Sequence, residues 1–88
     1  MISELRAWPL REPVSGRRYA VLRVTTDSGL RGYGECAAAS PAEVSEAQRL
    51  LVGQSETAYE VVRQRLAKLP QLQAAVNIAL LDIAGKLA

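Results

Sequence analysis

The sequence predicts an α+β fold in which a three-stranded antiparallel meander precedes three helices. Two patterns predict it. Apolar side chains alternate with a period of two before residue 36, and helical spacing replaces that alternation after Ser40. The length of 88 residues fits one domain. A chain of this size buries roughly 60–65% of its unfolded surface, which supports one modest core and no deep enclosed cavity.

The first two strands are expected at residues 2–12 and 18–27, joined by a short loop at 13–17. Pro9 places the end of the first strand at a sheet edge or bends it, because proline has no N–H to donate to a neighbouring strand. The second strand carries the stronger alternation. Its expected inward face holds Ala20, Leu22 and Val24.

Asp27-Ser28-Gly29 has the composition of a tight hairpin turn, so residues 30–35 are expected to return as the third strand. Gly32 and Gly34 then lie on one face of that strand. Glycines placed in this way indicate that another backbone or a packed element comes close.

The same glycines raise a competing hypothesis, since Gly32 to Ala37 fits the G-x-G-x-x-G/A pattern of a dinucleotide-binding turn. That turn needs a helix to begin directly after the glycines. Here the next helix start, Ser40, comes six residues after Gly34, and Glu35 would place a negative charge beside the phosphates. A hairpin also precedes the glycines, so we interpret them as part of a strand.

Two helices with capping boxes are expected next. Ser40 and Glu43 form the first box with proline at the first helical position, and Gly53 ends that helix. Thr57-Ala58-Tyr59-Glu60 is a second box, and its helix is expected to run to Lys68 or Leu69.

The third helix is expected from Pro70 to the end of the chain. It is apolar nearly all round, which is typical of a helix inside a larger body. Asp82 and Lys86, four residues apart, are expected to form a surface or interface pair.

Composition excludes several function classes. The net charge is +2 and the arginines are scattered without interleaved aromatics, so nucleic-acid binding is not expected. Polar residues interrupt the apolar C-terminal segment, so no membrane span is expected. The single cysteine and the absence of a secretory signal favour the cytoplasm. Without histidine, a Ser-His-Asp or Cys-His arrangement cannot form within the chain, and the dispersed acids predict no metal site.

Taken together, the chain resembles the N-terminal capping domain of the enolase superfamily, of the mandelate racemase and muconate-lactonizing type. The resemblance rests on VLRVTTDSGLRGYGEC (21–36), on AAVNIALLDIAGKLA (74–88) and on the Leu-x-Gly at 51–53 between them. Leu81 stands where the family commonly has tryptophan, and Asn77 where an acid is frequent. Both positions are expected to serve packing.

The resemblance implies that residues 1–88 are one domain and that a C-terminal (β/α) barrel outside the chain carries the catalytic groups and Mg²⁺. The parent would be an isomerase or lyase that acts alpha to the carboxylate of a small acid. The chain itself is expected to hold no catalytic residue, cofactor or metal, and to be inactive alone. The alternative is a free-standing α+β interaction module that forms homo-oligomers through its third helix.

The resemblance also implies that two loops of the cap close over the barrel and select the substrate. They correspond to residues 13–17 and 36–40, and the candidate substrate contacts are Arg17, Ser15, Glu35 and Cys36.

The residues themselves leave alternatives open at these candidates. Arg17 either binds a substrate carboxylate or is a solvated loop arginine. Glu35 either bonds to neighbouring backbone or borders the substrate. Cys36 is either a reactive thiol or a small packing residue at a strand end, and the second is favoured because no base lies nearby in the sequence.

Overall fold

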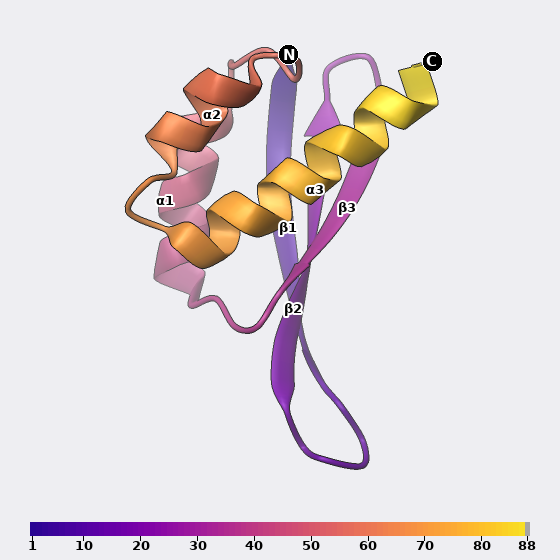
Figure 1. Ribbon diagram of the computed structural model, residues 1–88, viewed down its shortest axis with the longest axis vertical. Helices are drawn as coiled ribbons and strands as arrows, with labels where there is room; N and C mark the ends of the chain where they lie inside the picture. Colours follow the sequence, from indigo (N-terminus) through magenta and orange to yellow (C-terminus); the bar gives the residue numbers. More distant parts are fainter. Residues whose placement is uncertain (88) are drawn as a thin grey trace.

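The computed structural model describes residues 1–87 and confirms the α+β prediction (Figure 1). Three antiparallel strands form one sheet in the order β1-β2-β3. The strands are β1 (Ile2–Arg11), β2 (Arg18–Thr26) and β3 (Arg31–Cys36), and the helices are α1 (Pro41–Leu51), α2 (Tyr59–Arg65) and α3 (Pro70–Leu87). Pro9 lies on β1, an edge strand, as its missing donor requires.

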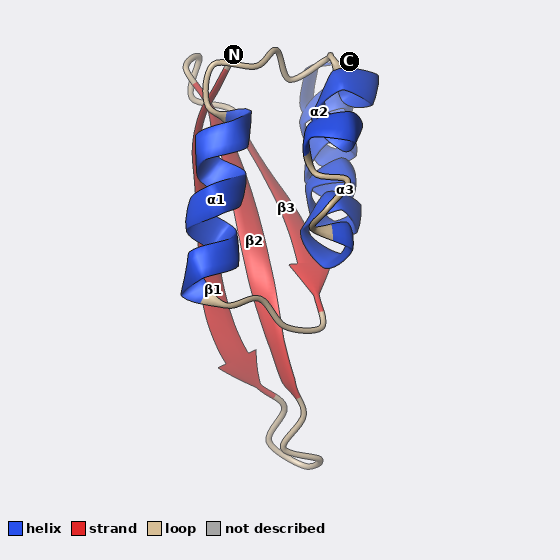
Figure 2. Ribbon diagram, turned by 90° about the vertical axis from the view of Figure 1, so that its left-hand side faces the viewer, coloured by secondary structure: helices blue, strands red, loops and turns tan. Residues whose placement is uncertain are grey.

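The helices cover one face of the sheet (Figure 2). Helix α1 packs on β1, whereas α3 packs on β3 and β2. Between the two layers lies an aliphatic core, which takes every second residue of β2. Its largest fully buried side chains include Leu5, Leu22, Leu51, Leu66, Leu72, Leu80 and Ile83. The β1–β2 hairpin extends beyond the helices, so the sheet face near its tip lacks a helical cover (Figure 1).

The α3–β3 seam, formed by Gly32, Gly34, Ala75 and Ala79, is a close backbone contact between the layers. A Cβ built on Gly32 would lie 2.0 Å from the carbonyl oxygen of Ala79, and one built on Gly34 would lie 2.0 Å from that of Ala75. No side chain fits in that space. The predicted close approach is therefore confirmed, and its partner is the backbone of α3.

Side chains of α3 also bond to the outer edge of β3. Asp82 accepts a hydrogen bond from the Tyr33 amide at 3.1 Å, and Lys86 donates to the Arg31 carbonyl at 2.5 Å. The two side chains form the expected ion pair, with 3.4 Å between the Lys86 nitrogen and the Asp82 oxygen. They therefore satisfy edge-strand groups that would otherwise be open to another strand.

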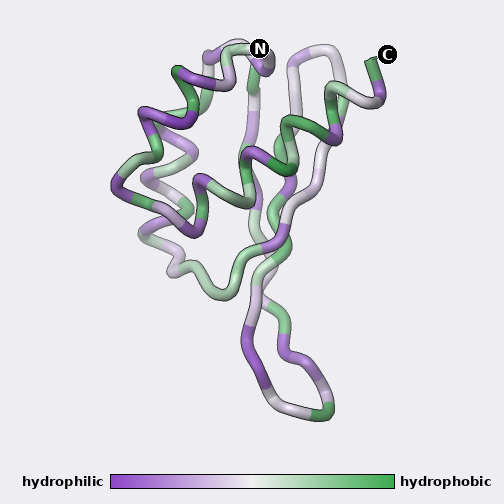
Figure 3. The backbone as a smooth tube through the Cα atoms, viewed as in Figure 1, coloured by the Kyte–Doolittle hydropathy of each residue, from purple (hydrophilic) through white to green (hydrophobic). Residues whose placement is uncertain are grey.

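Helix α3 keeps an exposed face. Hydrophobic stretches recur along its whole length (Figure 3), and six of its residues are buried. Ile78 and Leu81 nevertheless remain 52% and 57% exposed. Asn77 is exposed on the same face. The packing role expected for Leu81 and Asn77 therefore requires a surface outside residues 1–87.

The expectations for α2 are wrong at both ends. The helix begins after Ala58 without a side-chain cap, because the Thr57 hydroxyl pairs with Ser55 instead. It ends at Arg65, earlier than the expected 68–69. The capping box of α1 is confirmed, with Ser40 and Glu43 each bonded to the backbone amide of the other.

Candidate functional site

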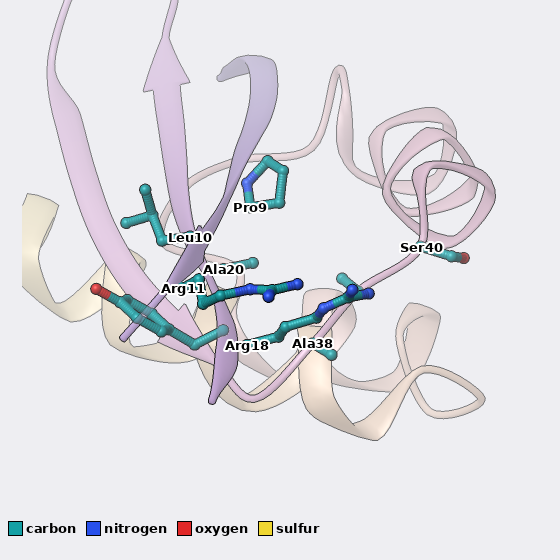
Figure 4. Close-up of a pocket in the computed structure, with 9 residues that line it drawn as sticks. Pro9, Leu10, Arg11, Arg18, Ala20, Ala38 and Ser40 are labelled. Atoms are coloured by element: carbon teal, nitrogen blue, oxygen red, sulfur yellow. The ribbon is translucent and has the colours of Figure 1, made fainter. Parts of the chain in front are cut away.

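The two loops singled out in the sequence lie apart: residues 13–17 form the tip of the β1–β2 hairpin, and residues 36–40 connect β3 to α1 (Figure 1). Between the base of the β1–β2 hairpin and the β3–α1 connection lies a hollow of about 490 Å³ (Figure 4). Its lining comprises Pro9, Leu10, Arg11, Arg18, Tyr19, Ala20, Ala38, Ala39 and Ser40.

A second hollow, of about 380 Å³, continues from the first between β1 and α1. The two share Pro9, Ala20 and Ala39. The second is lined mainly by apolar groups, including Ala7 and Val44. We call the pair of hollows the loop groove.

The groove exists because small side chains face a gap in the helical layer. Ala7 and Ala20 lie on the sheet face that the helices cover, as the β1–β2 register shows. The capping box at Ser40 fixes where α1 begins, and so sets the wall opposite the sheet. Alanines leave the space between sheet and wall open.

Two arginines supply the charge of the groove. Arg11 and Arg18 are directly opposite each other in the β1–β2 register. Both point from the sheet towards the β3–α1 connection (Figure 4). Within residues 1–87, neither forms an ion pair with a carboxylate. Like charges placed opposite one another across strands are unfavourable, and both side chains are exposed to solvent.

The structure places Arg17 and Ser15 in the hairpin loop, outside the lining of the groove. The Arg17 guanidinium lies 5.9 Å from the centre of the Tyr19 ring. The Ser15 hydroxyl and the amides of Ser15 and Val14 donate to Glu12. The hydrogen bond from the Ser15 hydroxyl, followed by those from the two amides, lowers the pKa of Glu12.

Glu35 and Cys36 point to opposite faces of β3. Glu35 lies on the exposed face beside Tyr33, Val21 and Ile78, and its carboxylate accepts no hydrogen bond from the described residues. Cys36 is buried, at 8% exposure, on the core face. Burial, reinforced by the charges of Glu43 and Glu35, raises the pKa of the Cys36 thiol. A protonated, enclosed thiol is a weak nucleophile.

The family described as "Mandelate racemase / muconate lactonizing enzyme, N-terminal domain" matches residues 6–88. The chain belongs to this family. The resemblance noted in the sequence is thereby confirmed.

Solved structures of this enzyme class share the fold. A muconate cycloisomerase from Azorhizobium caulinodans is 28% identical with a TM-score of 0.82, and the alignment covers 98% of this chain and 27% of that one. A mandelate racemase/muconate lactonizing enzyme from Roseiflexus sp. is 26% identical with a TM-score of 0.81. The alignment covers 94% of this chain and 27% of that one. A dipeptide epimerase from Enterococcus faecalis V583, at 21% identity, has the same fold with a TM-score of 0.79. The alignment covers 98% of this chain and 29% of that one.

This mandelate racemase/muconate lactonizing enzyme N-terminal domain thus spans less than a third of the solved chains that it matches. A search of curated protein sequences gives no significant match. Among residues 1–87, no helix has the length and hydropathy needed to cross a membrane.

Enzymes of the enolase superfamily generally use Mg²⁺, but the residues of this domain are unsuited to binding it. A hard cation needs several converging oxygen ligands. Within residues 1–87, no three acidic, histidine or cysteine side chains come together. The carboxylates beside the groove are also engaged, Glu12 by the hairpin and Glu43 by Ser40. The described residues therefore do not fit a Mg²⁺ site.

Sequence reasoning missed Arg11 and Arg18 because it placed both inside strands and searched for contacts in the loops. The expected loop at 13–17 would have paired residue 12 with residue 18, whereas the structure pairs Arg11 with Arg18. This difference of one position in the register hid the pair from sequence reasoning.

Proposed function

We propose that this chain is the substrate-selecting cap of an enzyme of the mandelate racemase/muconate lactonizing type. Its loop groove faces the active site of a C-terminal (β/α) barrel, and Mg²⁺ and the proton-transferring residues belong to that barrel. The parent enzyme removes a proton alpha to the carboxylate of a small acid, and then racemises, epimerises, cycloisomerises or dehydrates it. The cytoplasm is the expected location.

One observation supports this proposal: the stem of the β1–β2 hairpin and the β3–α1 connection border a groove that holds two arginines. Loops of this kind serve enzymes by closing over a substrate and excluding water. Arginine forks suit carboxylates because they donate two parallel hydrogen bonds. In this chain Arg11 and Arg18 would bind and orient the acid, and the alanine lining would keep water from it.

Names of related enzymes support the reaction class. The solved chains with this domain include a muconate cycloisomerase and a dipeptide epimerase. One N-terminal fold thus accompanies different reactions. This is what we expect if the cap selects the acid and another domain determines the chemistry.

The first test is the intact mass of the native gene product in its own cells. The proposal expects a mass several times the 9.5 kDa of this chain. That product should exchange the α-proton of a carboxylate for deuterium in D₂O, and only with Mg²⁺ present. Residues 1–88 alone should exchange none. A native product of 9.5 kDa, or Mg²⁺-dependent turnover by residues 1–88, would contradict the proposal.

A second candidate function is a free-standing interaction or oligomerisation module. The exposed Ile78 and Leu81 on α3 favour it, because a second copy could cover them. Light scattering after size exclusion, combined with thermal unfolding, discriminates between the two. A discrete dimer that unfolds cooperatively supports the module. A monomer, or heterogeneous aggregates dispersed by Leu81→Asn, supports a cap that lacks its barrel.

A further inference from the structure

We propose that Glu12 is a positioning residue. It holds the tip of the β1–β2 hairpin, residues 12–17, in one conformation before any substrate binds, so that the tip closes on the barrel as a preformed body. This proposal rests on the proposed function, since it assigns the order of one capping loop to a single carboxylate.

The Glu12 carboxylate is the centre of the hydrogen bonds in the tip. One of its oxygens accepts from the Val14 amide at 3.1 Å. The other accepts from the Ser15 amide at 2.6 Å and from the Ser15 hydroxyl. The oxygen of that hydroxyl in turn accepts from the Arg17 amide at 3.2 Å. One carboxylate therefore fixes residues 14 and 15 directly and reaches residue 17 through one hydroxyl.

The backbone of the tip supplies the remaining bonds. The Glu12 amide donates to the Arg17 carbonyl, and the Gly16 amide donates to the Glu12 carbonyl, both at 2.8 Å. Pro13 has no N–H to satisfy. Every backbone donor of residues 12–17 is therefore bonded to an acceptor within the tip, and three of these five donors depend on the side chains of Glu12 and Ser15.

Packing against the rest of the domain does not explain this order. Strand β3 ends opposite Ala20, so the hairpin is two-stranded beyond that residue, and its tip lies beyond the helices (Figure 2). Val14, in the tip, is 94% exposed. A two-stranded ribbon is only marginally stable by itself, and exposed loops are ordinarily the mobile parts of a domain. The conformation of the tip therefore depends on Glu12 and not on burial.

A preformed tip changes the cost of closing over a substrate. A loop that becomes ordered only on binding loses conformational freedom at that moment, and affinity falls accordingly. Here the order precedes binding, so Glu12 lowers that cost without touching the substrate. Any movement of the lid then takes place in the two-stranded stem, between Ala20 and the tip, and carries residues 12–17 as one body.

Relaxation of ¹⁵N nuclei in residues 1–88 tests the order of the tip without substrate. We expect backbone order parameters of about 0.85 at residues 14–16 in the native chain and below about 0.6 in Glu12→Gln. The glutamine has one acceptor oxygen and no charge, so it cannot hold both amides and the hydroxyl. Ser15→Ala keeps both bonds from the amides to the carboxylate and should give intermediate values.

A control variant and the core separate positioning from a general loss of structure. Glu60→Gln removes another exposed carboxylate, on α2, and should leave the order of the tip unchanged. In Glu12→Gln the amide signals of the buried Leu22 and Val24 should keep their native positions, and the melting temperature should stay that of the native chain.

Kinetics of the native gene product give the second readout. Glu12→Gln should raise KM about tenfold, the loss typical of a charged hydrogen bond, and leave kcat unchanged. This split is expected because a lost ordering contribution weakens the binding of substrate and transition state equally. Glu12→Asp keeps a carboxylate that can accept from the amide two residues on, so it should recover most of the loss.

A native tip as mobile as that of Glu12→Gln would overturn the proposal, and so would an unchanged KM in that variant. Failure of the capping proposal has a different signature. A native product of 9.5 kDa would contradict the cap and leave the measured order of the tip intact, because the relaxation measurement needs neither the barrel nor Mg²⁺.

Discussion

Two regions on the same face of the sheet use small residues with opposite results. At the α3–β3 seam, Gly32 and Gly34 bring the sheet against the helix backbone, and no space remains. In the loop groove, Ala7 and Ala39 border a hollow of about 380 Å³. A small side chain therefore specifies neither contact nor cavity. The outcome depends on whether another element reaches the site.

Enlarging a glycine of the α3–β3 seam should have the largest effect on stability. Gly34→Ala places a methyl group where the Ala75 carbonyl stands, so we expect unfolding free energy to fall by about 3 kcal/mol or more. Thermal unfolding should shift down by roughly 12 °C or more. Gly85→Ala is the matched control, because an added Cβ there meets no atom within 4 Å. The control should be neutral or stabilising. Equal melting temperatures for the two variants would contradict the close contact.

The helical wall of the loop groove depends on where α1 begins. Ser40→Ala removes the side-chain cap of α1 and should cost about 1 kcal/mol of unfolding free energy. Thr57→Ala should cost less than about 0.5 kcal/mol, since Thr57 does not cap α2. Denaturant unfolding of both variants measures the difference, and a larger loss for Thr57→Ala would refute the observed caps.

Enlarging a groove residue should cost little. Ala39→Leu adds a side chain that can extend into open space, so we expect a change of less than about 1 kcal/mol in denaturant unfolding. The losses of unfolding free energy in Ala39→Leu and Gly34→Ala can then be compared directly. A loss as large as that at the seam would mean that the groove is closed in solution.

The charged end of the groove should be slightly strained. Arg18→Gln relieves the repulsion from Arg11 and should stabilise the chain by about 0.5 kcal/mol at low salt. Added NaCl should reduce the gain, because exposed charges are screened. Arg65→Gln, at an exposed arginine on α2, is the control, and a destabilised Arg18→Gln variant would show that the guanidinium has an internal partner.

The smallest effect concerns the hairpin tip beside the groove. The pKa of Glu12 is lowered below its ordinary 4.5, chiefly by the Ser15 hydroxyl. A lowered pKa stabilises the fold above the unfolded value, and this stabilisation is lost as pH falls through the folded value. The Val14 and Ser15 amide signals should therefore move below pH 4.5 in an NMR titration. Glu12→Gln should remove that movement, and an unshifted midpoint in the native chain would refute the hydrogen bonds.

Much of the fold could be predicted because its signals are local. Alternation along residues 18–26 places a strand, Asp27-Ser28-Gly29 turns it, and Ser40 with Glu43 caps a helix within four residues. Local signals failed where two partners compete. Thr57 has the composition of a cap, yet its hydroxyl pairs with Ser55.

The site was less predictable than the fold. The loop candidate Arg17 stacks over Tyr19, whereas the groove receives Arg11 and Arg18 from strands. Strand pleating directs neighbouring residues to opposite faces, so a shift of one position decides which guanidinium enters the groove. That choice follows from the register of β1 against β2.

By itself, the sequence determined the order of the elements, the strand pleat, the turn and the cap of α1, since each depends on residues a few positions apart. Only the tertiary structure decided that the backbone of α3 fills the space beside Gly32 and Gly34 while the space beside Ala39 stays open. The two sites have residues of similar size, and they differ in how closely a segment from elsewhere in the sequence approaches them. Packing between layers sets that distance, and no local pattern encodes it.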